Sequence, residues 1–509
     1  MIATRLPTRL RLRPRSWSGL HGPTAQNYSG DKVLLSAAAL SAIQGQRGYH
    51  VAIVGSGPSA FYAAKYLFKT ANAASESTPM KVDMFERLPT PFGLVRFGVA
   101  PDHPEVKNVI HDFDDVAKTP GFRFFGNVEV GSAVPLSTLR SSYDAVVMCT
   151  GAQGERKLGI QGEDLEGVVG APDFVKWYNG HPEHAALEPK DPGEAAAVIG
   201  QGNVALDVAR ILARSPEALQ PTDIDPRALA KIGEWQRKGL RTVHVIGRRG
   251  FVQAAFTNKE LRELDTYEDV LPIVDPKDLE LCRNPASEQE LSKNRMKKRS
   301  VQILEKMAAN FAQRESTSKR IVWLRFLSSP ASILPDSAGS AVAGIRVDRT
   351  ELSGEPGKQA AVKASSGASE DLPCGLVVRS VGFDLVPLPG LPLNDRLRVP
   401  HQQGRVEDPA GGLYVAGWVK RGPTGIIATN LTDAQETVAR LMADLSSRGS
   451  ESTADPSPVE AAVSDSGTQV VSYSDWKKIE AEELRRGTAQ GRAAEKLTDI
   501  GEMLRLAGA

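Results

Sequence analysis

The sequence is poor in cysteine, and its three cysteines lie far apart. Cys149, Cys282 and Cys374 form no C-x-x-C pair. A structural zinc site needs clustered thiolates or imidazoles, and a dithiol relay needs two neighbouring thiols. We therefore expect no metal site and no thiol-based redox chemistry in this chain.

Long apolar runs and an excess of one charge are also missing. No stretch approaches the roughly 18 to 20 apolar residues of a membrane-spanning helix, so we expect no transmembrane segment. The 62 basic and 61 acidic residues nearly cancel, which leaves a net charge of +1. A balanced chain of this kind gives no indication of nucleic-acid binding.

Acidic residues are absent from the first thirty positions. The same segment contains Arg5, Arg9, Arg11, Arg13 and Arg15. This composition is typical of a mitochondrial transit peptide, whereas a secretory signal needs an uninterrupted apolar core of about 7 to 15 residues. We predict a transit peptide and leader over residues 1–48 and a location in the mitochondrial matrix, with peripheral contact with the inner membrane left open. A disordered basic tail is the alternative.

Two segments have the order strand, glycine turn and helix. Residues 49–54 are apolar and lead into Gly55-Ser56-Gly57-Pro58-Ser59-Ala60. Residues 195–199 lead in the same way into Gly200-Gln201-Gly202-Asn203-Val204-Ala205. Further apolar runs alternate with helical segments, which indicates an α/β fold with parallel, doubly covered sheets. The two turns predict two Rossmann-like dinucleotide-binding domains.

An acidic residue distinguishes the first turn. Gly55 and Gly57 allow a tight turn and a close approach of the backbone to a pyrophosphate. Glu86 ends the next apolar run, where its carboxylate can accept hydrogen bonds from ribose hydroxyls. Because a carboxylate would repel a 2′-phosphate, we expect FAD or NAD at this turn.

Arginines follow the second turn instead. The apolar run 243–246 ends in Gly247-Arg248-Arg249, and two guanidinium groups match a 2′-phosphate. We predict NADPH here, with solvated surface charges as the alternative. Its pyrophosphate is expected on the turn residues Gln201, Gly202, Asn203 and Val204. Asp207, one helical turn further, is either a polar group near the cofactors or an early-helix acid favoured by the helix dipole.

Three longer motifs resemble one family. They are PTPFGLVRFGVAPDHP at residues 89–104, QGNVALD at 201–207 and GWVKRGPTGII at 417–427. With these motifs, the chain from Tyr49 to Arg505 resembles the mitochondrial adrenodoxin reductases and ferredoxin-NADP reductases, two-Rossmann flavoproteins of the glutathione-reductase-like class. The resemblance implies that FAD takes hydride from NADPH and delivers single electrons to an acidic mitochondrial [2Fe-2S] ferredoxin.

The resemblance also implies which residues hold the cofactors. Beside Gly55 and Gly57, the residues for FAD are Ser59, Glu86, Leu94, Val130, Trp418, Gly425, Ile426 and Ile427. Those for NADPH are Gln201 to Val204, Arg248, Arg249, Glu260 and Gly425. Ser59 departs from the alanine expected in relatives, but a contact through its backbone amide does not depend on the side chain.

The implied domain order places the NADP domain inside the FAD domain. We expect the FAD domain at residues 49–152 and 381–509, with the NADP-binding domain at 153–380 between these parts. The Gly- and Ser-rich segment 353–370 and the Ser-rich segment 446–466 are expected to be surface insertions. The tail beyond residue 475 is expected to be helical.

The sequence also contains candidate residues for the flavin chemistry and for docking of the ferredoxin. Hydride transfer needs no obligatory acid or base, because the protein mainly positions the two rings. His103 and Asp207 are candidates for a polar pair beside the flavin; the alternative for His103 is a purely structural role. Trp418 is a candidate for a contact with the edge of the flavin; the alternative is an aromatic residue that fills the core. A basic surface for the ferredoxin is predicted at Arg262, Arg295, Lys297, Lys298 and Arg299. A solvated helix face is the alternative.

Two other functions stay open from the sequence. One is a related NADPH-dependent flavoprotein with another electron acceptor, and the other is a redox-silent FAD-binding protein. A thioredoxin-type reductase is disfavoured, since it needs a vicinal dithiol.

Overall fold

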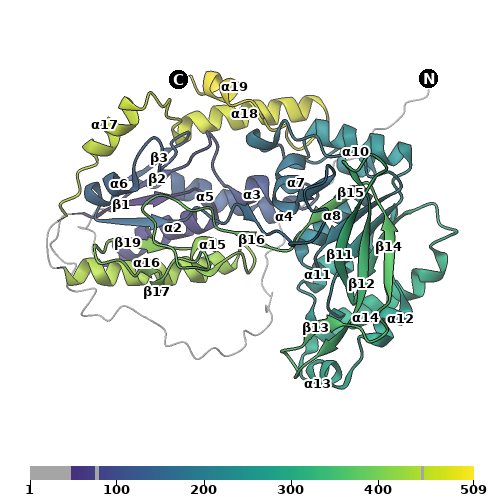
Figure 1. Cartoon of the computed structure of the whole chain (residues 1–509). Coiled ribbons are helices and arrows are strands. Elements are labelled where there is room, and N and C mark those ends of the chain that lie inside the picture. Colours follow the sequence, from purple (N-terminus) through teal and green to yellow (C-terminus); the bar gives the residue numbers. More distant parts are fainter. Residues whose placement is uncertain (1–47, 75–79, 449–451, 509) are drawn as a thin grey trace, which may run out of the picture.

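The computed structural model describes residues 48–74, 80–448 and 452–508 (Figure 1). Residues 1–47 of the predicted leader lie outside the described residues. Figure 1 shows two bodies side by side, one around β1 and β2 and the other around β11 and β12. Each body contains its own parallel sheet.

The first sheet has seven strands in the order β17-β18-β19-β4-β1-β2-β3. Its parallel strands are β1 (His50–Val54), β2 (Lys81–Phe85), β3 (Phe122–Phe125), β4 (Ala145–Met148) and β19 (Leu413–Val415). The strands β18 (Arg405–Val406) and β17 (His401–Gln402) add an antiparallel edge. We call this sheet and its helices the first unit.

Helices cover both faces of the first sheet. Alternate residues of a strand point to opposite faces, so neighbouring residues of β1 pack against different helices. Val51 and Ile53 of β1 pack with α2 (Pro58–Ala74) and α16 (Thr429–Ser447). Ala52 and Val54 pack on the other side with α6 (Leu136–Ser142) and α17 (Ser457–Asp465). The first glycine turn therefore joins a buried central strand to a buried helix.

The second sheet has six parallel strands in the order β6-β15-β7-β8-β10-β9. They are β6 (Val168–Gly170), β7 (Ala195–Ile199), β8 (Thr242–Ile246), β9 (Val270–Val274), β10 (Arg320–Arg325) and β15 (Leu376–Arg379). The chain leaves the first sheet after β4 and returns to it with β17, so this second unit is inserted into the first. The predicted fold class, with one Rossmann-like unit inside another, is confirmed.

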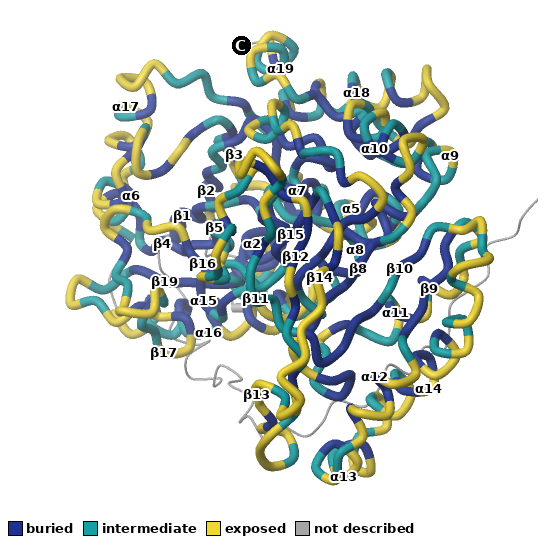
Figure 2. The backbone as a smooth tube through the Cα atoms, turned by 45° about the vertical axis from the view of Figure 1, so that its right-hand side comes forward, coloured by how far each residue is buried: buried dark blue, intermediate teal, exposed yellow. Residues whose placement is uncertain are grey.

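The two faces of the second sheet are covered by different structures. Ala196 and Val198 of β7 pack with α8 (Asn203–Ala213) and α10 (Pro226–Lys238). Ala197 of β7 instead packs in one cluster with Ile333, Ile345 and Leu372. Those three residues belong to an antiparallel sheet of β11 (Ser328–Pro335), β12 (Val342–Ser353), β13 (Ala360–Lys363) and β14 (Ser369–Pro373). This antiparallel sheet was not predicted from the sequence, and Figure 2 shows β11, β12 and β14 lying beside β15 and β8.

The two segments predicted to be surface insertions contain regular structure. Residues 353–370 include β13 and the start of β14, and most of their side chains are exposed. Residues 446–466 include α17, where Val459 and Val463 are buried against α6. Two valines four positions apart give this helix an apolar edge, so this second segment contributes to the core and is not a simple surface loop.

The C-terminal tail is helical and reaches both units. The helix α18 (Tyr473–Ala489) buries Trp476 and Ile479 in the core of the first unit. Before α19 (Ile500–Ala507), the guanidinium of Arg492 donates a hydrogen bond to the carbonyl oxygen of Ile224 in the second unit. In the described part of the chain, no helix combines the length and the apolar character needed to cross a bilayer.

Candidate functional site

The two glycines of the first turn differ in their surroundings: the fold requires a glycine at Gly55, whereas Gly57 borders open space. Gly55 has φ 96°, and a Cβ there would lie 2.6 Å from the carbonyl oxygen of Cys149. A Cβ at Gly57 would have no neighbour within 4 Å. The turn can therefore receive a ligand close to the backbone of Gly57.

Residues from distant segments surround this turn. Gly93, in the loop before the short helix α3 (Leu94–Phe97), would bring a Cβ within 3.3 Å of the Cα of Gly57. A Cβ at Gly417 would lie 2.5 Å from the Oγ of Ser59. Two of the three family-like motifs thus converge on the first turn.

Glu86 lies directly beyond β2, beside the turn. Its Oε2 accepts hydrogen bonds from the backbone nitrogen of Ser56 at 3.1 Å and from the Ser56 Oγ at 2.6 Å, and its Oε1 accepts one from the Leu88 nitrogen at 3.1 Å. Burial raises the pKa of Glu86, although the hydrogen bonds from Ser56 and Leu88 oppose this shift. The acceptor atoms thus lie where the first turn would place a ribose.

The remaining residues predicted for FAD take different positions. Val130 is buried in the first unit. Trp418, at the start of α15 (Trp418–Arg421), is half-buried, and its ring centroid lies 5.2 Å from that of Phe383. Ile426 is 60% exposed, which is high for a large apolar side chain. Gly425 (φ 87°) and Ile427 lie in the same loop.

The second glycine turn repeats the arrangement of the first. A Cβ at Gly200 would lie 2.1 Å from the carbonyl oxygen of Ser380, whereas Gly202 again has no neighbour within 4 Å. Gly202 precedes α8, and no side chain caps the start of this helix. The Ala205 amide donates a hydrogen bond to the Gly202 carbonyl oxygen at 3.1 Å, whereas the amides of Asn203 and Val204 at the start of the helix are available to an anion. The Asn203 Oδ1 accepts a hydrogen bond from the Thr257 nitrogen at 2.8 Å, which fixes the turn to the loop before α11 (Asn258–Leu264).

Arg248 and Arg249 lie beyond the end of β8, as the sequence predicts, and both are exposed. Neither forms a salt bridge with another of the described residues. Arg248 also lines a cavity of about 170 Å³, together with Asp348, Thr350 and Lys363. Two guanidinium groups without an acidic partner are suited to a phosphate monoester.

A buried polar cluster lies between the two units. The His103 Nε2 lies 2.9 Å from the Oε2 of Glu263, and the nearest ligand atoms of His103, Asp207 and Glu260 all lie within 4.8 Å of one another. Arg210, with a side chain that is 0% exposed, lies beside the same carboxylates. The structure thus brings the predicted pair His103 and Asp207 together.

Burial and the neighbouring positive charge shift the pKa values of the carboxyl groups in this cluster in opposite directions. Burial raises the pKa of Asp207 and of Glu260, despite the attraction of Arg210 and His103. Burial would also raise the pKa of Asp102, but the salt bridge with Arg210 holds it below its usual value. At least one carboxyl group of the cluster therefore retains a proton more readily than an exposed acid does.

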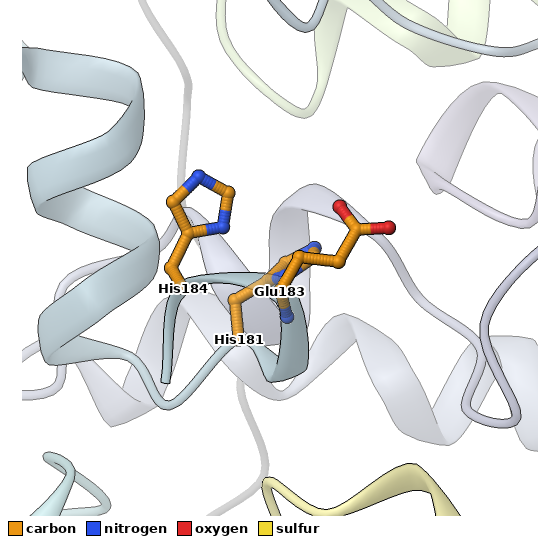
Figure 3. Close-up of side chains that lie close together, drawn as sticks. All are labelled: His181, Glu183 and His184. Atoms are coloured by element: carbon orange, nitrogen blue, oxygen red, sulfur yellow. The ribbon is translucent and has the colours of Figure 1, made fainter. Parts of the chain in front are cut away.

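A second group of potential metal ligands, His181, Glu183 and His184, lies on a short 3-10 helix (Pro182–His184) (Figure 3). Glu183 pairs with Arg87, and the His184 Nε2 lies 2.9 Å from the Asp173 Oδ1. Figure 3 shows the Glu183 carboxylate directed away from the His184 ring. Burial and nearby cations lower the pKa of His181 to about 2. Because protein groups already engage Glu183 and His184, this geometry favours a structural role.

The residues predicted for docking lie on two adjacent helices. Arg295, Lys298 and Arg299 are exposed on the first turns of α14 (Arg295–Ala309). Arg262 is exposed on α11, which a hydrogen bond of 2.9 Å from Asn258 to the carbonyl oxygen of Met296 joins to α14. Lys297 differs from the other four because it pairs with Glu290 of α13 (Pro285–Lys293). We call Arg262, Arg295, Lys298 and Arg299 the basic surface.

Sequence reasoning missed Asp102, Arg210 and Glu263. Asp102 lies beside His103 in a quoted motif, and Arg210 lies three residues after Asp207, on the same side of a helix. Those spacings were the signals in the sequence that could have identified Asp102 and Arg210. Nothing in the sequence indicated that the two segments meet.

Comparisons with known proteins agree with this architecture. The family described as pyridine nucleotide-disulphide oxidoreductase matches residues 49–264. NADPH:adrenodoxin oxidoreductase of Homo sapiens is 45% identical over 467 residues, covering 90% of this chain and 92% of that protein. NADPH-ferredoxin reductase FprA of Mycobacterium tuberculosis is 43% identical over 469 residues, covering 90% and 99%.

A solved structure is equally similar. FprA of Mycobacterium tuberculosis in complex with NADPH superposes with a TM-score of 0.84 at 42% identity, covering 91% of this chain and all of that one. The similarity extends over both units and includes both glycine turns. The chain therefore belongs to the family of the NADPH:adrenodoxin oxidoreductases and NADPH-ferredoxin reductases.

Proposed function

We propose that this protein is an NADPH:ferredoxin oxidoreductase that holds FAD at the first glycine turn and NADPH at the second. The observation that carries the proposal is the contrast between the residues that follow the two turns. Glu86 follows the strand beside the first turn, and Arg248 and Arg249 follow the strand beside the second. One turn thus suits an unphosphorylated ribose and the other a 2′-phosphate.

FAD held at the first turn would supply the conversion between two-electron and one-electron transfer that a one-electron acceptor requires. The protein's own groups bind and orient the two cofactors. Glu86 would accept hydrogen bonds from ribose hydroxyls, the start of α8 would face a pyrophosphate, and the two arginines would bind the 2′-phosphate.

The proposed FAD residues are those near the first turn and the loop after β19. They are Gly55, Gly57, Ser59, Glu86, Leu94, Val130, Trp418, Gly425, Ile426 and Ile427. The proposed NADPH residues are Gln201, Gly202, Asn203, Val204, Arg248, Arg249, Glu260 and Gly425. On this basis we assign residues 49–152 and 381–509 to an FAD domain and 153–380 to an NADP domain.

The electron acceptor in this proposal is a small acidic [2Fe-2S] ferredoxin, which docks on the basic surface. Four exposed cations without salt-bridge partners among the described residues support this assignment, because opposite charge accelerates encounter. The names of the curated relatives support a ferredoxin-type acceptor as well.

We further propose that the protein acts in the mitochondrial matrix, with peripheral contact with the inner membrane at most. The acid-free, arginine-rich start of the sequence supports import. The mitochondrial relatives support it too, whereas the bacterial relatives are about equally similar.

The arginine pair gives the most specific test of the cofactor assignment. Changing both Arg248 and Arg249 to alanine should raise the KM for NADPH about 100-fold or more, since two lost charged hydrogen bonds are together worth about 3–6 kcal/mol. The KM for NADH, measured with ferricyanide as acceptor, should change little. An equal effect on both nucleotides would reject the assignment of the 2′-phosphate site.

A flavin spectrum recorded under anaerobic conditions distinguishes the proposed enzyme from a redox-silent FAD-binding protein. NADPH should bleach the flavin absorbance within the mixing time of a manual experiment. A flavin peak that NADPH leaves unchanged would reject the enzyme proposal.

A further inference from the structure

Arg210 joins the two units through a buried, bidentate ion pair. Its Nε lies 2.7 Å from the Oδ2 of Asp102, and its Nη2 lies 3.0 Å from the Oδ1. Asp102 belongs to the loop before α4 (Pro104–Lys107) of the first unit, whereas Arg210 lies in α8 of the second. The Arg210 side chain is 0% exposed and that of Asp102 is 7% exposed.

The same guanidinium also reaches Asp207, the candidate catalytic carboxylate, and Glu260, a residue predicted for NADPH. Its Nη2 lies 2.8 Å from the Asp207 Oδ1, and its Nη1 lies 3.7 Å from the Glu260 Oε2. Because His103 follows Asp102 directly, the ion pair also fixes the loop that brings the His103 ring to Glu263. One side chain therefore connects acidic groups of three segments.

The charges of the cluster depend on Arg210. Asp102, Asp207, Glu260 and Glu263 provide four carboxyl groups, which lie around the guanidinium of Arg210 and the imidazole of His103. Loss of a fully buried guanidinium would leave carboxylates facing one another, which is costly unless they rearrange or take up protons. In addition, the Arg210 Nη1 and the Glu260 Oε2 are buried and form no hydrogen bond with the described residues. The cluster thus retains hydrogen-bonding capacity for a further polar group.

We propose that Arg210 is a positioning residue for hydride transfer, holding the loop of His103 against Asp207 and Glu260 and thereby fixing the two nucleotide sites relative to each other. This inference rests on the proposed function, because the rate of a hydride transfer depends steeply on how the two rings are placed. Arg210 acts through the groups that it orients.

A second ion pair between the units, which is partly buried, provides a control. The Lys107 Nζ lies 2.7 Å from both carboxylate oxygens of Asp223. The Lys496 Nζ lies 2.8 Å from the same carboxylate, so Asp223 keeps a partner when Lys107 is removed. Lys107→Met therefore breaks a contact between the units without removing any side chain of the His103 cluster.

The first readout is the rate of flavin reduction by saturating NADPH, measured by anaerobic stopped flow on the holoenzyme. Arg210→Met should lower this rate about 10- to 100-fold, as expected for misplaced reacting groups, while the half-saturating NADPH concentration changes less than about threefold. Arg210→Lys should recover part of the rate, and Lys107→Met should stay within about twofold of the wild type.

The second readout does not depend on activity. In protein labelled with ¹⁵N at histidine, the ring signals of His103 report its hydrogen bond to Glu263. They should move in Arg210→Met and remain in place in Lys107→Met. Should Arg210→Met fail to fold, Arg210→Lys and the near-isosteric Asp102→Asn provide the same comparison.

Equal rate losses in the Arg210 and Lys107 variants, with unmoved His103 signals, would overturn the inference and reduce Arg210 to a structural contact. If NADPH failed to reduce the flavin of the wild-type protein, the proposed function would fail instead. The histidine signals would then still show whether Arg210 orients His103.

Discussion

At the scale of single residues, we expect Gly55 to be required for stability and Gly57 for ligand binding. Gly55→Ala places a Cβ 2.6 Å from the Cys149 oxygen at a positive φ, so we expect a lower melting temperature, equivalent to about 1–3 kcal/mol. Gly57→Ala fills open space; it should keep the melting temperature of the flavin-free protein but lose bound flavin. Melting curves and flavin absorbance of purified protein measure both effects. Full flavin content in Gly57→Ala would contradict the assignment of the first turn.

Single residues also show how far the sequence alone can predict the site. Glu86, Arg248 and Arg249 were predictable because each ends an apolar run that follows a glycine turn in the sequence. Arg210 and Asp102 were not, since 108 positions separate them and only the packing of the two units brings them together. Lys297 was expected in the docking surface, but its pairing with Glu290 depends on the fold of α13.

At the scale of elements, α14 is expected to provide the docking surface. Charge reversal at Arg295 and Lys298 should raise the KM for ferredoxin about tenfold or more, because these exposed charges steer encounter. Turnover with NADPH and ferricyanide should stay unchanged. Lys306→Glu, an exposed change at the other end of the same helix, is the matched control. Unchanged ferredoxin kinetics in the double variant would reject this surface.

The segment between α18 and α19 should make stability depend on pH. Burial and the neighbouring Lys107 lower the pKa of Lys496 to about 7, although Asp223 attracts the amine. In the unfolded chain the amine keeps its proton up to about pH 10. Between these values the unfolded state binds more protons, so the free energy of unfolding should rise with pH, at most by about 1.4 kcal/mol per pH unit.

Unfolding transitions at pH 7, 8 and 9 test this linkage. Lys496→Met, which has no amine to titrate, should show a smaller rise than the wild type. An identical pH dependence in both proteins would show that Lys496 does not contribute it.

At the scale of the whole molecule, the inserted arrangement followed from the resemblance that the three family-like motifs carry. The antiparallel sheet over the second unit was not predicted, because strands such as β13 and β14 lie in Gly- and Ser-rich sequence without a long apolar run. The burial of α17 was missed for the same reason, since only two valines of a Ser-rich segment are buried.

The central claim for the molecule is electron transfer from NADPH to a ferredoxin. The most direct measurement is the reduction of cytochrome c by NADPH, with and without a purified mitochondrial [2Fe-2S] ferredoxin. We expect the rate to rise in proportion to added ferredoxin and NADH to support little of it. A rate that is the same with and without ferredoxin would contradict the claim.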